Sequence, residues 1–240
     1  MQKNDVINAR YLDGDYADKN PTWDAEDAPW KANNVYKILK SNDVSPQTIA
    51  EVGCGSGAVL AELSGLNKSI NYSGYDIAPA AKEYWKKYDD LEIKFVLEDF
   101  LKVSSESYDV ILLLDVLEHL ADPYKLLEHM HDRTNYLVVH FPLDLSVLSV
   151  LRESPLLHVR RKVGHIHYYT KGLALELLDE CGYEVIDACY TNASLTAPKI
   201  TIKTKLFGVI RNVLGWISKD IAVRLLGGET LMVLARPKGS

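Results

Sequence analysis

The sequence has few cysteines, and their scarcity excludes two classes of protein. Only three occur among 240 residues, Cys54, Cys181 and Cys189, and no two of them form a Cys-x-x-Cys pair. An odd number of cysteines without such a pair argues against a disulfide scaffold and against a structural zinc site. We therefore expect a protein of the reducing cytoplasm with no metal among its site residues.

Long apolar runs and an excess of basic residues are missing as well. No segment approaches the roughly 18 uncharged apolar residues that span a bilayer, and the first residues lack the apolar stretch of a secretory signal. The formal net charge is −6, so an overall basic surface for nucleic acid is absent and we expect no nucleic-acid partner. With 47% hydrophobic residues, the chain can bury one sizeable core.

Short apolar runs alternate with helix-like segments along most of the chain. This alternation predicts right-handed βαβ units, with helices on both faces of a mostly parallel sheet. A long connection before the final run allows the last strand to be antiparallel. The expected strands are 48–52, 70–75, 93–97, 108–114, 136–140, 183–190 and 230–235. The predicted fold class is α/β, Rossmann-like and seven-stranded, with ligands beyond the carboxyl ends of the strands.

Two segments lie outside the predicted core, which takes residues 46–198 and 229–238. Residues 1–45 form an expected helical cap, whose aromatic side chains are candidates to cover an acceptor pocket: Tyr11, Tyr16, Trp23 and Trp30. Residues 199–228 form an expected basic amphipathic helical insertion, because basic residues outnumber the single acid there and apolar residues recur at helical spacing. Its role stays open between a lid, a homodimer contact, a peripheral membrane contact and plain packing on the sheet edge.

A glycine turn follows the first expected strand. Gly53-x-Gly55-x-Gly57 leaves the backbone accessible to a ligand, and the helix after it offers free N–H groups. An acid, Asp76, ends the second expected strand, where a carboxylate can accept hydrogen bonds from two adjacent hydroxyls. A nicotinamide-dependent dehydrogenase would share these features, but its usual turn is one residue longer.

Four phrases of the sequence, in this order, resemble successive motifs of class I S-adenosylmethionine-dependent methyltransferases: residues 51–57 (EVGCGSG), 74–77 (GYDI), 98–100 (EDF) and 114–120 (LDVLEHL). The resemblance covers about residues 46–190 and the last strand. Within that family, the chain is similar to the small-molecule enzymes of ubiquinone and menaquinone biosynthesis. The resemblance implies methyl transfer from S-adenosylmethionine to a small-molecule acceptor, most often to an oxygen. The basic residues of segment 199–228, with Arg152, Arg160, Arg161 and Lys162 as a second basic group, make an anionic or lipid-like acceptor one expectation.

The resemblance also implies roles for individual residues. The glycine turn would hold the methionine part of the cofactor, Asp76 the ribose hydroxyls, Ile77 the adenine ring and Asp99 the adenine amino group. The segment at Leu114 would lie beside the sulfonium end. The complete expected cofactor-binding set is Glu51, Gly53, Cys54, Gly55, Gly57, Asp76, Ile77, Asp99, Phe100, Leu114 and Asp115.

Methyl transfer to a hydroxyl also benefits from a base, and histidine titrates near neutrality. The candidates are His140, which follows an expected strand, His165, which precedes the next helix, and His119. In the family that the chain resembles, the histidine at the place of His119 is more often positional than catalytic. His167 alternates with His165 and is expected to be a packed or surface histidine. A base is not obligatory, and a non-catalytic adenosyl-binding or regulatory protein stays an alternative.

A metal-assisted reaction is the other alternative. Asp115, Glu118 and His119 have the spacing of one helix face, which is also a ligand spacing for a divalent metal. Small-RNA terminal 2′-O-methyltransferases resemble this arrangement, but the sequence departs from their Glu-x-x-Glu-His group at Asp115. We expect a chelator to leave turnover unchanged.

Overall fold

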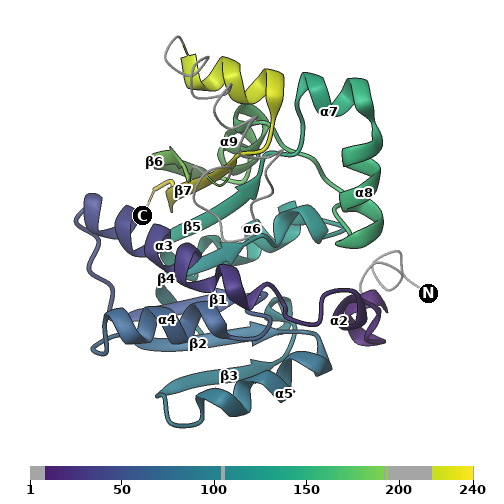
Figure 1. Cartoon of the computed structure of the whole chain (residues 1–240). Helices are drawn as coiled ribbons and strands as arrows, with labels where there is room; N and C mark the ends of the chain where they lie inside the picture. The colour runs from purple at the N-terminus through teal and green to yellow at the C-terminus, as the bar shows by residue number, and fades with distance from the viewer. Residues whose placement is uncertain (1–8, 104–105, 192, 194–217, 240) are drawn as a thin grey trace.

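A single seven-stranded sheet forms the centre of the computed structural model, which describes residues 9–103, 106–191, 193 and 218–239 (Figure 1). The strands are β1 (Thr48–Val52), β2 (Asn71–Asp76), β3 (Ile93–Leu97), β4 (Tyr108–Leu114), β5 (Thr134–Pro142), β6 (Tyr183–Tyr190) and β7 (Thr230–Pro237). Their order across the sheet is β3-β2-β1-β4-β5-β7-β6. The pairs among β1 to β5 are parallel, whereas β7 is antiparallel to both β5 and β6. The predicted fold class is confirmed.

Helices cover both faces of this sheet. Side chains of α3, α4 and α5 pack on one face, and those of α6 and α9 pack on the other. The helix bounds are α2 (Asp15–Lys19), α3 (Ala28–Ser41), α4 (Ala58–Leu66), α5 (Lys82–Trp85), α6 (Pro123–His131), α7 (Val147–Arg152), α8 (Ser154–Lys162) and α9 (Lys171–Glu180). Residues 218–226 are helical as well.

The core explains why β4 lies at the centre. Its side chains alternate between the two faces, as a strand of period two requires. Val110 and Leu112 pack toward α3 and α4, whereas Ile111 and Leu113 pack toward α6 and α9, and all four are fully buried. A strand buried on both faces has the continuous apolar sequence that residues 110–114 show.

The insertion predicted at residues 199–228 can be followed only in part, because residues 199–217 lie outside the described residues. In the helix 218–226, Ala222 and Val223 are buried, whereas Ile221 and Leu225 are exposed. The apolar stripe expected at Ile221 and Leu225 is therefore not the packed face of this helix. Within the described part of the chain, none of the helices has the length and apolar character needed to cross a membrane.

Candidate functional site

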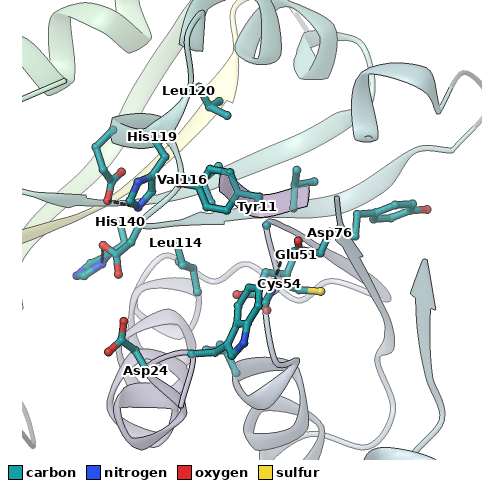
Figure 2. Close-up of a pocket in the computed structure, with 18 of the residues that line it drawn as sticks. Tyr11, Asp24, Glu51, Cys54, Asp76, Leu114, Val116, His119, Leu120 and His140 are labelled. Atoms are coloured by element: carbon teal, nitrogen blue, oxygen red, sulfur yellow. Dashed lines mark hydrogen bonds and ion pairs between the residues drawn. The ribbon is translucent and has the colours of Figure 1, made fainter. Parts of the chain in front are cut away.

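A cavity of about 510 Å³ opens at the carboxyl ends of the central strands. It is lined by the glycine turn after β1, by the ends of β2 and β4, and by aromatic side chains of the N-terminal segment (Figure 2). The residues of the expected sites that line it are Glu51, Gly53, Cys54, Gly55, Asp76, Ile77, Asp99, Phe100, Leu114, Asp115, His119, His140 and His165. Gly57 is the one member of the expected sets that does not line this cavity.

The glycine turn is held by the strand beside it and by Asp76. The N–H groups of Gly53 and Cys54 donate to the Tyr75 carbonyl at 2.8 and 3.0 Å, and the Gly55 N–H donates to Asp76 Oδ2 at 2.8 Å. The Ala78 N–H donates to the other oxygen of Asp76 at 2.8 Å. Burial raises the pKa of Asp76, and these N–H donors oppose that rise. The carboxylate is thus fixed at the cavity wall.

Gly57 has a structural role behind the turn. It has a φ of 77°, in the left-handed region, at the N-cap position of α4. A Cβ at this position would lie 2.5 Å from the Phe95 ring, which stacks on Trp85 with 5.1 Å between ring centroids. Glycine is therefore required both by backbone conformation and by the space available.

Glu51 is buried at the cavity wall. Its side chain is 3% exposed, and Oε2 has no hydrogen-bond partner among the described residues. Burial raises the pKa of Glu51 to about 8, although Lys31 opposes this rise. A buried oxygen that lacks a partner among these residues suits a ligand that donates a hydrogen bond.

Asp115 joins a network that the sequence did not indicate. Its carboxylate lies 2.7 Å from Lys31 Nζ of α3 and 2.7 Å from His140 Nδ1 of β5. Burial disfavours the charged carboxylate, but His140 and Lys31 outweigh this effect and hold the pKa of Asp115 below its usual range. The same pairing raises the pKa of Lys31 in spite of its burial. This network ties the N-terminal segment to the sheet.

His140 uses both ring nitrogens inside this network. Nδ1 lies 2.7 Å from Asp115, and Nε2 lies 2.8 Å from Thr230 Oγ1, which in turn bonds Thr191. The side chain is 2% exposed. A base needs a free lone pair that faces the substrate, so this geometry disfavours His140 as the base.

The expected single helix face of Asp115, Glu118 and His119 is wrong. Asp115 has a φ of 57°, and only Leu117–His119 form a short 3-10 turn. The carboxylate of Asp115 pairs with Lys31 and His140, and Glu118 is not among its hydrogen-bond partners in the described part of the chain. Residues of this segment therefore divide between two clusters.

Glu118 and His119 meet His165 instead. Glu118 Oε1 lies 4.0 Å from His119 Nε2 and 3.9 Å from His165 Nε2. Burial, together with the neighbouring His165, lowers the pKa of His119 to about 3. Burial raises the pKa of Glu118 well above its usual range, with the charge of Asp115 adding to the rise. His167 bonds the Leu120 carbonyl at 2.9 Å through Nε2, in keeping with the expectation of a packed histidine.

Aromatic residues of the N-terminal segment lie over the cavity. Tyr11, Tyr16, Trp23 and Trp30 all line it. The Tyr11 and Tyr16 ring centroids are 5.1 Å apart, and those of Tyr16 and Trp23 are 5.3 Å apart. Tyr11 also lies beside His119, with 6.1 Å between the two ring centroids, so the ring cluster extends to the histidines (Figure 2).

Comparison with known proteins gives this geometry a context. The chain is 29% identical over 163 residues to a tRNA U34 carboxymethyltransferase of Campylobacter jejuni, an alignment with 62% of this chain and 54% of that protein. The chain thus spans about half the length of this relative. It is 32% identical over 93 residues to the mitochondrial ubiquinone biosynthesis O-methyltransferase of Saccharomyces cerevisiae, covering 37% of this chain and 30% of that one.

Structural and family comparisons agree on the fold. The plantazolicin methyltransferase BpumL, solved in complex with S-adenosylhomocysteine (SAH), superposes with a TM-score of 0.65 at 16% identity, covering 98% of this chain and 95% of that one. The sequence model of the methyltransferase domain family matches residues 31–188, which is more than half of the chain. The chain therefore belongs to the methyltransferase domain family.

Proposed function

We propose that this protein transfers a methyl group from S-adenosylmethionine to an acceptor bound under the aromatic residues of the N-terminal segment. One observation carries the proposal: the glycine turn, fixed by Asp76, shares a single cavity with the unpartnered Glu51 oxygen. Family membership and the SAH-bound structural relative support the same donor.

The residues present fit this cofactor. The buried Glu51 oxygen offers an acceptor for the amino group of the methionine part, and Asp76 offers a carboxylate for the ribose hydroxyls. Gly53 and Gly55 line the cavity without side chains, so a ligand can approach their backbone. A side chain does not fit at Gly53, because its Cβ would lie 2.7 Å from Val116. When bound, the cofactor supplies an electrophilic methyl on a sulfonium leaving group.

The protein's part in the reaction is alignment, exclusion of water and removal of a proton. Tyr11, Tyr16 and Trp23 cover the cavity and keep it dry. His165 is the best-placed base, because Asp144 holds its Nδ1 at 2.6 Å and leaves Nε2 on the cavity side. His119 is a weaker base, since a pKa of about 3 leaves it little affinity for a proton.

The proposed acceptor is a small molecule that is methylated on oxygen. The ubiquinone-pathway relative supports an oxygen acceptor, and the net charge of −6 disfavours a long nucleic acid. The tRNA-modifying relative makes an RNA acceptor the main competitor. Strong salt dependence of turnover would identify an RNA acceptor.

Calorimetric titration with SAH tests cofactor binding without an acceptor. Asp76→Ala removes an acceptor of charge-assisted hydrogen bonds, each of which is worth about 1.5–3 kcal/mol, so we expect affinity to fall at least about 10-fold. Asp132→Ala, at a side chain that is 97% exposed, is the matched control and should bind as the wild type does. Unchanged SAH affinity in Asp76→Ala would refute the proposed cofactor site.

Turnover needs a separate experiment. A panel of small hydroxylated acceptors and bulk tRNA is incubated with the enzyme and methyl-labelled cofactor, and the labelled product is identified. If the label appears in RNA and in none of the small molecules, the proposed acceptor class is wrong and RNA takes its place. If SAH binds but no labelled product forms, a regulatory role is favoured over an enzymatic one.

A further inference from the structure

The cluster of Glu118, His119 and His165 has the donors of a metal site. One ligand atom from each residue lies within 4.8 Å of the other two. Two imidazoles and one carboxylate suit zinc and the other divalent first-row transition metals, which bind such sets with positions left open. The three side chains line the cavity, so an ion between them would face its interior.

Glu118 supplies a second, independent observation. It has no exposed surface, and neither carboxylate oxygen has a hydrogen-bond partner among the described residues. A buried carboxylate without a hydrogen bond is costly unless a cation or a proton neutralises it. Both imidazoles stand beside it at 3.9 and 4.0 Å, beyond hydrogen-bond distance.

His165 is held in the orientation of a ligand. Asp144 Oδ2 lies 2.6 Å from its Nδ1, which leaves Nε2 directed toward Glu118. A carboxylate on the far nitrogen of a histidine is the usual support of a metal-bound imidazole, because it fixes both ring and tautomer. The N–H groups of Ile166 and His167 donate to the Glu118 carbonyl at 2.8 and 3.1 Å, which joins the two ligand segments.

We propose that Glu118, His119 and His165 bind one divalent first-row transition-metal ion, with the remaining coordination positions directed into the cavity. The separations of 3.9 and 4.0 Å exceed the edge of about 3.4 Å expected for bonds of about 2.1 Å. Loading therefore requires these two pairs of atoms to close by about 0.5 Å, and the third pair, which lies within 4.8 Å, to adjust as well. The proposal departs from the sequence-based expectation of a site without metal. It also replaces the role of His165 as a base, because an ion bound at Nε2 occupies the lone pair that would accept the proton.

The test is binding of cobalt(II) alone to the full chain, freed of any purification tag. Cobalt absorption in the visible range reports coordination, and calorimetry gives stoichiometry and affinity. We expect one ion per chain, displaced by zinc. Asp144→Asn should keep this stoichiometry and weaken affinity by about 10–100-fold, because it loosens His165 without removing a ligand. Glu118→Gln and His165→Asn should lower affinity more than Asp144→Asn does.

His131→Asn is the matched control. This histidine bonds Asp132 and the Gly182 carbonyl outside the cluster, so its replacement should leave cobalt binding unchanged. Thermal unfolding of each metal-free variant checks that it is folded. Absence of cobalt binding to the wild type, or binding that Glu118→Gln and His165→Asn leave intact, would overturn the proposal. Neither readout involves methyl transfer, so failure here is distinct from failure of the proposed function.

Discussion

Gly57→Ala should destabilise the protein by an amount that its surroundings determine. A φ of 77° costs an alanine about 1–2 kcal/mol relative to glycine. The new Cβ would also lie 2.5 and 2.6 Å from two atoms of the Phe95 ring. That ring cannot withdraw easily, because it stacks on Trp85 and already lies against Gly74. Overpacking of this kind costs about 1–3 kcal/mol, so we expect a total loss of about 2–5 kcal/mol.

Urea unfolding followed by circular dichroism measures this loss. Gly65→Ala is the matched control, because Gly65 lies in α4 with nothing within 4 Å of its added Cβ. Alanine has a higher helix propensity than glycine, so the stability of the control should be unchanged or higher by up to about 1 kcal/mol. If the free energy of unfolding of Gly57→Ala lies within about 0.5 kcal/mol of the wild-type value, the argument from backbone strain and ring overlap is refuted.

Two further predictions concern the buried charges of the cavity. The folded-state pKa of Glu51 is raised from about 4.5 to about 8, so its contribution to stability is complete below pH 4.5 and is lost as pH rises toward 8. Between pH 5 and pH 8, the free energy of unfolding of Glu51→Gln, measured with urea, should therefore rise by about 2–4 kcal/mol relative to that of the wild type. A difference between the two proteins that does not change with pH would contradict this. Lys31→Met removes a partner of Asp115 in a partly exposed pair, and we expect a loss of about 1–3 kcal/mol at pH 7. Lys86→Met, which breaks the exposed pair with Glu83, should lower the free energy of unfolding by less than about 0.5 kcal/mol. Equal losses of stability in Lys31→Met and Lys86→Met would contradict the expected effect of burial on the ion pair.

Local patterns were sufficient for the sheet and the cofactor side of the cavity. Apolar runs located all seven strands, and β5 proved longer than expected because it pairs with β4 on one side and β7 on the other. The glycine turn and Asp76 follow consecutive parallel strands that pair directly, so their juxtaposition follows from the βαβ order.

The acceptor side was less accessible to prediction. The sequence favoured His140 and His165 over His119 as the base, but it could not show that Asp115 and Thr230 engage both nitrogens of His140. Lys31 carried no motif at all. A lysine in a helix is usually a surface residue, and only the packing of α3 over the strand ends brings it to Asp115.

Hydrophobic periodicity and the conformational freedom of glycine act between near neighbours, so they were enough to predict the elements, their βαβ order and the glycine turn. The meeting of charged and imidazole groups depends instead on how distant segments pack together. Asp115 pairs with Lys31 and His140, whereas the segment before α9 is hydrogen-bonded to the Glu118 carbonyl and brings His165 within 3.9 Å of the Glu118 carboxylate. Such pairings depend on where distant segments cross the sheet, which the spacing of residues along the chain does not predict.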